Sequence, residues 1–223
     1  MKTISYLNKI IQTIFIKRFE PYVWRPLKKE IETILLNNGE GLYLANIKTA
    51  GSDFISKIIG LFSNNYSHTI IFTYYNNLSI MFKQHDLIKV KKNLNYFYGN
   101  TILDFDRIKT IVLSSANAEG IMCCDLSKYH NRKMTIRKIP FTLEEEKKCI
   151  EFLCNQINNP YDTTGLIGWI FKKWDDPDNY YCSEICYDAC LHAGYKIALI
   201  DNPSPGDIEI YAAFNNWKNL YDL

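Results

Sequence analysis

The sequence predicts a single domain of the α+β class. Its 223 residues include 47% hydrophobic and 22% charged side chains, with only 10 Gly and 7 Pro, which is typical of one globular domain with a sizeable core. Segments with the helical period and segments with strand-like apolar runs both occur along the chain, without an internal repeat. The composition excludes low-complexity disorder, collagen-like repeats and coiled coils.

The first 37 residues are expected to form a helical extension, and residues 38–223 the domain itself. Residues 4–19 carry apolar side chains on one helix face and polar ones on the other, which indicates an amphipathic helix. This helix either lies on a membrane surface or docks on the domain. Polar residues interrupt it, so neither a signal peptide nor a transmembrane segment is expected. A second helix is expected over residues 27–37, ended by Asn-Asn-Gly.

The next part of the chain is expected to alternate strands with one helix. Strand-like sequences occur at residues 41–46, 69–75 and 110–113. Residues 51–62 have helical spacing, and Asn76-Asn77 predicts a hairpin turn. The charged and aromatic stretch beyond this turn makes residues 76–109 an expected insertion.

The last third is expected to contain one strand and two well-delimited helices. Residues 135–139 form the strand, and Thr142 with Glu145 forms a capping box that opens a helix running to about residue 157. A loop follows at residues 159–162, and an aromatic, helix-like stretch lies around residues 169–174. The final helix runs over residues 182–193 and is closed by glycine.

Charge and cysteine content exclude several classes of protein. With 26 Lys+Arg against 24 Asp+Glu, the net charge of +2 lacks the basic excess of a nucleic-acid-binding protein. Seven scattered cysteines indicate reduced thiols and therefore a cytoplasmic or other intracellular location. Abundant Asn, Ile, Lys and Tyr are typical of an AT-rich genome, which fits a bacterium, a phage or a large DNA virus.

Cys182 is the candidate nucleophile because it lies where a turn-rich loop meets a helix. A thiol in the first helical turn feels the positive end of the helix dipole, which lowers its pKa toward the reactive thiolate. Cys186 and Cys190 follow on the same helix face and are interpreted as packing residues. Three thiolates stacked along one helix face cannot close a tetrahedron, so neither a metal nor another cofactor is expected.

His68 is the candidate base because it opens an apolar strand directly after a polar loop, at the rim of the expected sheet. The chain has four histidines, and His130 and His192 are placed less favourably. The alternative interpretation of His68 is a structural or solvated side chain.

Several short motifs resemble, in order, the circularly permuted branch of the NlpC-type papain-like cysteine hydrolases, the YiiX/YebB-like group. Gly-Glu-Gly-Leu-Tyr-Leu at residues 39–44 is similar to the opening strand of this family, and Tyr-Ser-His-Thr-Ile-Ile at 66–71 to its base-bearing strand. Pro-Tyr-Asp at 160–162 and Tyr-Cys-Ser-Glu-Ile at 181–185 resemble its loop and its nucleophile helix. Pro-Gly-Asp-Ile at 205–208 resembles its closing segment.

The resemblance implies a permuted papain-like fold, in which a small antiparallel sheet packs on helices. It also implies that Cys182 is the nucleophile and His68 the general base, with Tyr181 and Tyr161 lining the site. For the third residue, which orients the imidazole, one alignment gives Ser115, with Glu119 as a substitute. A second alignment gives Gln84 or His85.

The expected activity is hydrolysis or acyl transfer at an amide or ester bond through an acyl-enzyme. The substrate is expected to be of peptide or lipid type, and residues 4–19 would supply a peripheral membrane contact. A serine at the orienting position and the long insertion favour an alternative, a catalytically inactive papain-like module that binds a protein or a membrane. The sequence leaves the oligomeric state undetermined.

Overall fold

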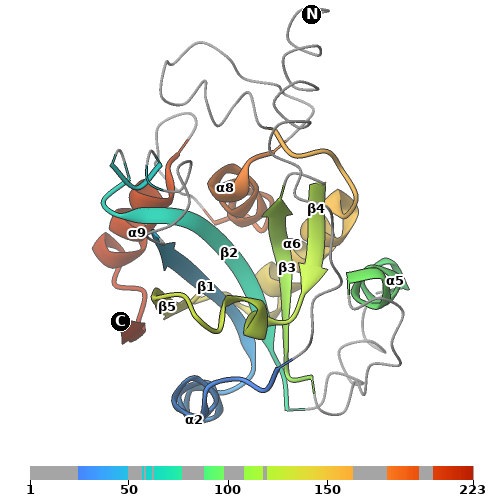
Figure 1. Cartoon of the computed structure of the whole chain (residues 1–223), viewed down its shortest axis with the longest axis horizontal. Coiled ribbons are helices and arrows are strands. Elements are labelled where there is room, and N and C mark those ends of the chain that lie inside the picture. The colour runs from blue at the N-terminus through green and yellow to red at the C-terminus, as the bar shows by residue number, and fades with distance from the viewer. Residues whose placement is uncertain are drawn as a thin grey trace, which may run out of the picture.

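The protein is built on a six-stranded antiparallel sheet with strand order β4-β3-β2-β1-β5-β6 (Figure 1). The strands are β1 (Gly41–Lys48), β2 (Tyr66–Tyr74), β3 (Thr110–Asn117), β4 (Gly120–Cys124), β5 (Met134–Lys138) and β6 (Asn219–Asp222). The helices are α2 (Lys29–Asn38), α5 (Ile88–Phe97), the 3-10 turn η1 (Leu126–Tyr129), α6 (Leu143–Gln156), α8 (Cys182–His192) and α9 (Pro205–Phe214). The expected α+β class, with an antiparallel sheet packed on helices, is confirmed.

The computed structural model describes residues 25–49, 57, 59–61, 63–76, 88–97, 108–117, 120–162, 180–195 and 203–222. Several sequence expectations lie outside these residues: the amphipathic helix over 4–19, most of the helix over 51–62, the aromatic stretch at 169–174, and Gln84, His85 and Glu119. No helix among the described residues is both long and apolar enough to cross a bilayer.

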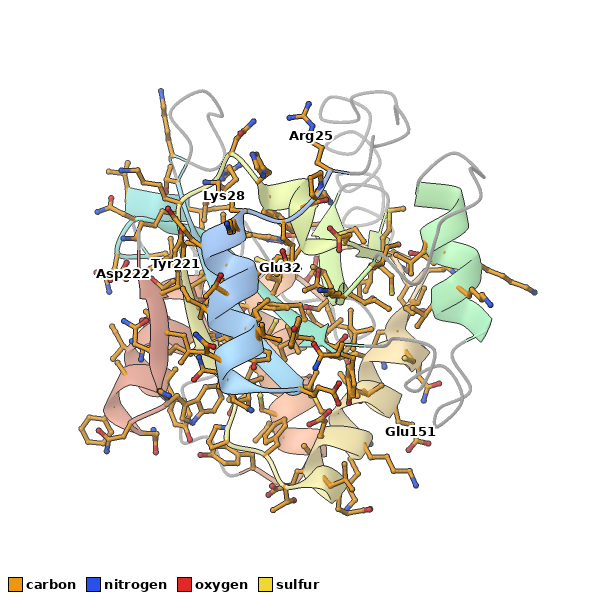
Figure 2. All side chains as sticks on the ribbon, turned by 90° about the horizontal axis from the view of Figure 1, so that it is seen from below. Arg25, Lys28, Glu32, Glu151, Tyr221 and Asp222 are labelled. Atoms are coloured by element: carbon orange, nitrogen blue, oxygen red, sulfur yellow. The ribbon has the colours of Figure 1, made fainter. Side chains whose placement is uncertain are left out.

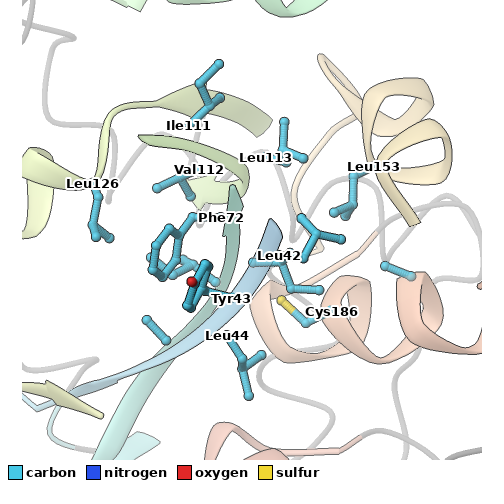
Figure 3. Packing of buried hydrophobic residues seen from close by; sticks show 14 of the residues in the cluster. Leu42, Tyr43, Leu44, Phe72, Ile111, Val112, Leu113, Leu126, Leu153 and Cys186 are labelled. Carbon is cyan, nitrogen blue, oxygen red and sulfur yellow. The ribbon is translucent and has the colours of Figure 1, made fainter. Parts of the chain in front are cut away.

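The two faces of the sheet carry different partners because successive strand residues point to opposite sides. Helices α6, α8 and α9 pack on one face. On that face Leu42 of β1 lies near Cys186 of α8, whereas Tyr43 stacks on Phe72 of β2 on the other face, with ring centroids 5.4 Å apart (Figure 3). The core therefore has two layers, separated by the central strands.

Local capping residues set the helix boundaries as the sequence predicts. Thr142 and Glu145 form the expected capping box of α6, and the Thr142 N–H donates to Glu145 Oε2 at 2.7 Å. Helix α8 ends before Gly194, whose φ of +90° is the left-handed conformation that a helix end requires of glycine. Helix α9, which the sequence analysis did not select, has its own capping box of Ser204 and Asp207.

The two ends of the segment between β2 and β3 are held together beside the sheet. The Tyr75 N–H donates to the Lys109 carbonyl at 3.0 Å, which closes the base of the segment. Helix α5 lies within it and is fixed to β4 and the α6 end through Asn93, whose side chain accepts from the Cys123 N–H and donates to Asn158. The expected hairpin at residues 76–77 continues outside the described residues, and β2 pairs with β1 and β3 instead.

Strands β2 and β3 pair only over residues 72–74 of β2 and then diverge. The Ile71 N–H, which would otherwise continue the ladder, donates to the Ser114 hydroxyl at 2.8 Å. Ser114 in turn contacts the Cys186 sulfur at 3.5 Å. The N-terminal half of α8 therefore lies beside the gap between the two strands (Figure 1).

We expect Gly120→Ala to destabilise the fold more than Gly194→Ala. Both glycines have positive φ, so both substitutions cost about 1 kcal/mol or more in backbone strain. At Gly120, however, the new Cβ would lie 2.5 Å from the Asn159 carbonyl oxygen, whereas at Gly194 it meets nothing within 4 Å. Urea denaturation measures the difference, and equal free energies of unfolding for the two variants would contradict the close approach of Gly120 to the Asn159 carbonyl.

Candidate active site

Cys182 is the first residue of α8 and is 1% exposed. The helix starts there because Tyr181 is extended and its N–H donates to Glu184 Oε2 at 3.3 Å, which supplies half of a capping box. The thiol therefore occupies the first turn, as the sequence predicts. Cys186 and Cys190 follow at one-turn intervals and are buried, in agreement with their interpretation as packing residues.

Hydrogen-bond donors surround the sulfur of Cys182. The backbone N–H groups of Thr69, Ser183 and Cys182 itself are directed at it, together with the Tyr161 hydroxyl. These donors favour the thiolate, but burial is the larger effect, and the pKa of Cys182 lies above that of a free thiol. In this conformation the group is a neutral thiol placed among donors that would stabilise a negative charge.

Tyr161 contacts the Cys182 sulfur from the loop at residues 159–162, which lies beside the start of α8. Its backbone bridges Tyr180, and the Asp162 N–H donates to the Tyr180 carbonyl at 3.0 Å. Burial, with the neighbouring Cys182 as a lesser cause, raises the pKa of Tyr161 well above its usual value, so the hydroxyl keeps its proton. Tyr181, the other predicted site-lining residue, donates its hydroxyl to the Pro203 carbonyl at 3.3 Å and anchors α8 to the start of α9.

His68 lies on the same strand as Thr69, but its side chain points to the opposite face of the sheet. There its Nε2 forms a hydrogen bond of 3.2 Å with the Tyr129 hydroxyl of η1. Burial first, and then the charges of Lys128 and Arg132, lowers the pKa of His68 to about 3. The structure therefore brings the His68 backbone to the thiol through the Thr69 peptide, but not the imidazole ring.

The candidates for the orienting residue are placed only in part. Ser115 lies in β3 opposite Met122, on the strand next to that of His68, and Gln84, His85 and Glu119 are outside the described residues. The residue that does bond the imidazole is Tyr129, which the sequence analysis missed. Its signal is weak, because a tyrosine in a polar loop has no periodic pattern to mark it.

The described residues include no group of three or more His, Cys, Asp or Glu side chains that could hold a metal ion. The site itself consists of the Cys182 thiol, the hydroxyl of Tyr161 and the backbone N–H donors. Donors of this kind favour the thiolate form of a cysteine over the neutral thiol.

No known family model matches this chain, and no curated protein matches its sequence.

We expect His68 to make the folded protein sensitive to acid. Its pKa of about 3 in the folded state lies below the value of about 6.5 for an unfolded chain, so the unfolded state binds the proton first. Stability should therefore fall as the pH drops below about 6.5, by at most about 2–3 kcal/mol between pH 7 and pH 4.5 from this partly exposed residue.

Denaturant titrations of the wild type and of His68→Gln at both pH values measure this contribution. Glutamine keeps a polar group beside Tyr129 and has no titrating proton, so the variant should lose less stability on acidification. The same loss in both proteins would show that the ring is solvated rather than buried.

Proposed function

We propose that the protein is a cysteine hydrolase or acyltransferase acting on amide or ester bonds, with Cys182 as nucleophile and His68 as general base. The observation that carries the proposal is the set of N–H and O–H donors around the Cys182 sulfur in the first turn of α8. The other two cysteines of the helix have fewer such groups: Cys186 has the Ser114 hydroxyl and the Ile71 N–H, and Cys190 has burial alone as the cause of its raised pKa. Donors around a sulfur stabilise the thiolate, which is the form of a cysteine that attacks a carbonyl.

The proposed fold is the permuted papain-like fold of the NlpC type. Three features support it besides the order of the motifs. The base-bearing segment is a strand in an antiparallel sheet, the Pro-Tyr-Asp loop lies against the nucleophile, and the nucleophile opens a helix packed on the sheet. In this fold the segment between β2 and β3 is an insertion.

The chemistry begins from a neutral pair, because burial opposes charge on both groups. His68 turns about its side-chain bonds from Tyr129 toward the sulfur, which lies next to the peptide joining His68 to Thr69. This movement takes the ring off the face where Lys128 and Arg132 depress its pKa. The imidazole can then accept the thiol proton as the attack proceeds.

Acyl transfer follows in two balanced steps. The sulfur attacks the carbonyl carbon, and the imidazolium returns the proton to the leaving amine or alcohol as its bond to carbon breaks, which leaves a thioester on Cys182. Water or a second acceptor then attacks the thioester after giving a proton to the imidazole, and the thiol is restored. We propose a peptide- or lipid-type substrate for this cycle.

An inactive binding module is the second candidate function. Two observations favour it: Cys182 is 1% exposed, and the imidazole is bonded to Tyr129 rather than to the thiol. A scaffold of this kind would bind a protein or membrane partner without turnover.

The two functions differ in their reaction with a generic activated ester such as p-nitrophenyl acetate. The enzyme should form a thioester on Cys182, mapped to that residue by peptide mass spectrometry. His68→Gln should slow the acylation by about 100-fold or more, since general-base assistance contributes at least that factor.

Cys186→Ala is the matched control, because it removes a buried thiol one turn further along the same helix. It should leave acylation of Cys182 unchanged. Acylation that does not depend on His68, or that falls on other cysteines at equal rates, would refute the hydrolase and favour the binding module.

A further inference from the structure

A continuous chain of buried polar side chains runs across the helix-covered face of the sheet. Arg137 of β5 donates to Glu209 Oε1 of α9 through Nε and Nη2, at 3.0 and 2.6 Å. The other carboxylate oxygen of Glu209 accepts from Asn46 Nδ2 at 2.7 Å. Asn46 Oδ1 accepts from the Thr69 hydroxyl, also at 2.7 Å. Asn46 and Thr69 are directly paired across β1 and β2, so their side chains share one face.

Burying this series of polar side chains costs free energy, and each of its members is hydrogen-bonded to the next. The side chains of Arg137 and Glu209 are only 10% and 12% exposed, and Asn46 and Thr69 are completely buried. The remaining guanidinium nitrogen, Nη1, donates to the Trp217 carbonyl at 2.7 Å. Apolar residues of similar volume are often as stable as a buried ion pair, so stability alone gives little reason for such a network. The network does fix the relative positions of its four side chains.

The chain ends at the candidate nucleophile. Thr69 holds Asn46 through its side chain, while its backbone N–H points at the Cys182 sulfur from the edge of β2 that β3 leaves free. Because the side chain and the N–H belong to one residue, fixing the hydroxyl restricts the direction of the N–H. The network therefore connects the last helix and β5 to the position of one donor at the sulfur.

We propose that Glu209 and Asn46 are positioning residues, which act through the Thr69 hydroxyl to hold the Thr69 N–H against Cys182. The role of that N–H is to stabilise negative charge on the sulfur as the thiol loses its proton. Arg137 pairs with Glu209 and so offsets part of the cost of burying that carboxylate. This inference deepens the proposed function and rests on Cys182 being its nucleophile.

The sharpest test is Thr69→Val, which removes the hydroxyl, keeps the backbone N–H and nearly preserves the side-chain volume. Thr73→Val is the matched control: Thr73 lies four residues further along β2 on the same face, is equally buried, and its hydroxyl has no hydrogen-bond partner among the described residues. Thr69→Ser restores the hydroxyl. The pH midpoint of iodoacetamide alkylation at Cys182, mapped by mass spectrometry, is measured in all four proteins.

We expect the midpoint of Cys182 to rise by about 0.5–1 pH unit in Thr69→Val, with the wild-type value in Thr73→Val and in Thr69→Ser. A midpoint equal in Thr69→Val and Thr73→Val would overturn the proposal. Alkylation requires no turnover, so this result is separate from the ester experiment. If the wild type is not acylated by the ester but the alkylation midpoint still shifts in Thr69→Val, the proposed hydrolase is rejected and the proposed positioning role of the network is retained.

A measurement on the wild type makes the test independent of how well Thr69→Val folds. The Thr69 amide proton should change its NMR chemical shift with the same midpoint as Cys182 alkylation, and Cys182→Ala should abolish this titration. An amide signal that does not respond to Cys182 ionisation would show that no such contact exists and would overturn the proposal.

Discussion

The site depends on the divergence of β3 from β2, because β3 pairs with only the last three residues of β2. A buried strand must satisfy its backbone N–H groups, and before residue 72 the β3 ladder does not do so for β2. The Ser114 hydroxyl takes the Ile71 N–H, and the Cys182 sulfur faces the Thr69 N–H. The gap between two strands thus becomes the place where the first turn of α8 fits, and the sulfur acquires a donor that a closed sheet would have used.

The electrostatics around this gap favour uncharged groups, while the network behind it carries charge. Burial raises the pKa of Cys182 and lowers that of His68, so thiol and imidazole both rest neutral. The Arg137–Glu209 ion pair is held by hydrogen bonds between the two side chains and from Arg137 to the Trp217 carbonyl. Charge is thus kept two side chains away from the sulfur, where it can fix geometry without competing for the thiol proton.

Much of the fold could be predicted from local patterns. The capping box at Thr142 and the helix opened by Cys182 each depend on neighbouring residues, and both lie where expected. The sequence analysis does not predict β4, β6, α5 or α9: β4 is a run of only five residues, and α9 has little amphipathic contrast in its sequence. The Asn76-Asn77 turn predicts a hairpin with the segment that follows it directly. The structure instead pairs β2 with β3, which begins more than 30 residues after this turn. Strand pairing over that distance is not encoded in a local turn.

The sequence by itself determined that Cys182 opens a helix and that His68 lies on an apolar strand, because capping chemistry and hydrophobic alternation are local. It could not determine which face of β2 meets α8. That choice is made by strand register and by the pairing of β1 with β5, and it sends the His68 ring to Tyr129 and the Thr69 hydroxyl to Asn46. The contacts that join α9 to the candidate nucleophile include one between Asn46 and Glu209, 163 residues apart, and only the packed tertiary structure brings such distant side chains together.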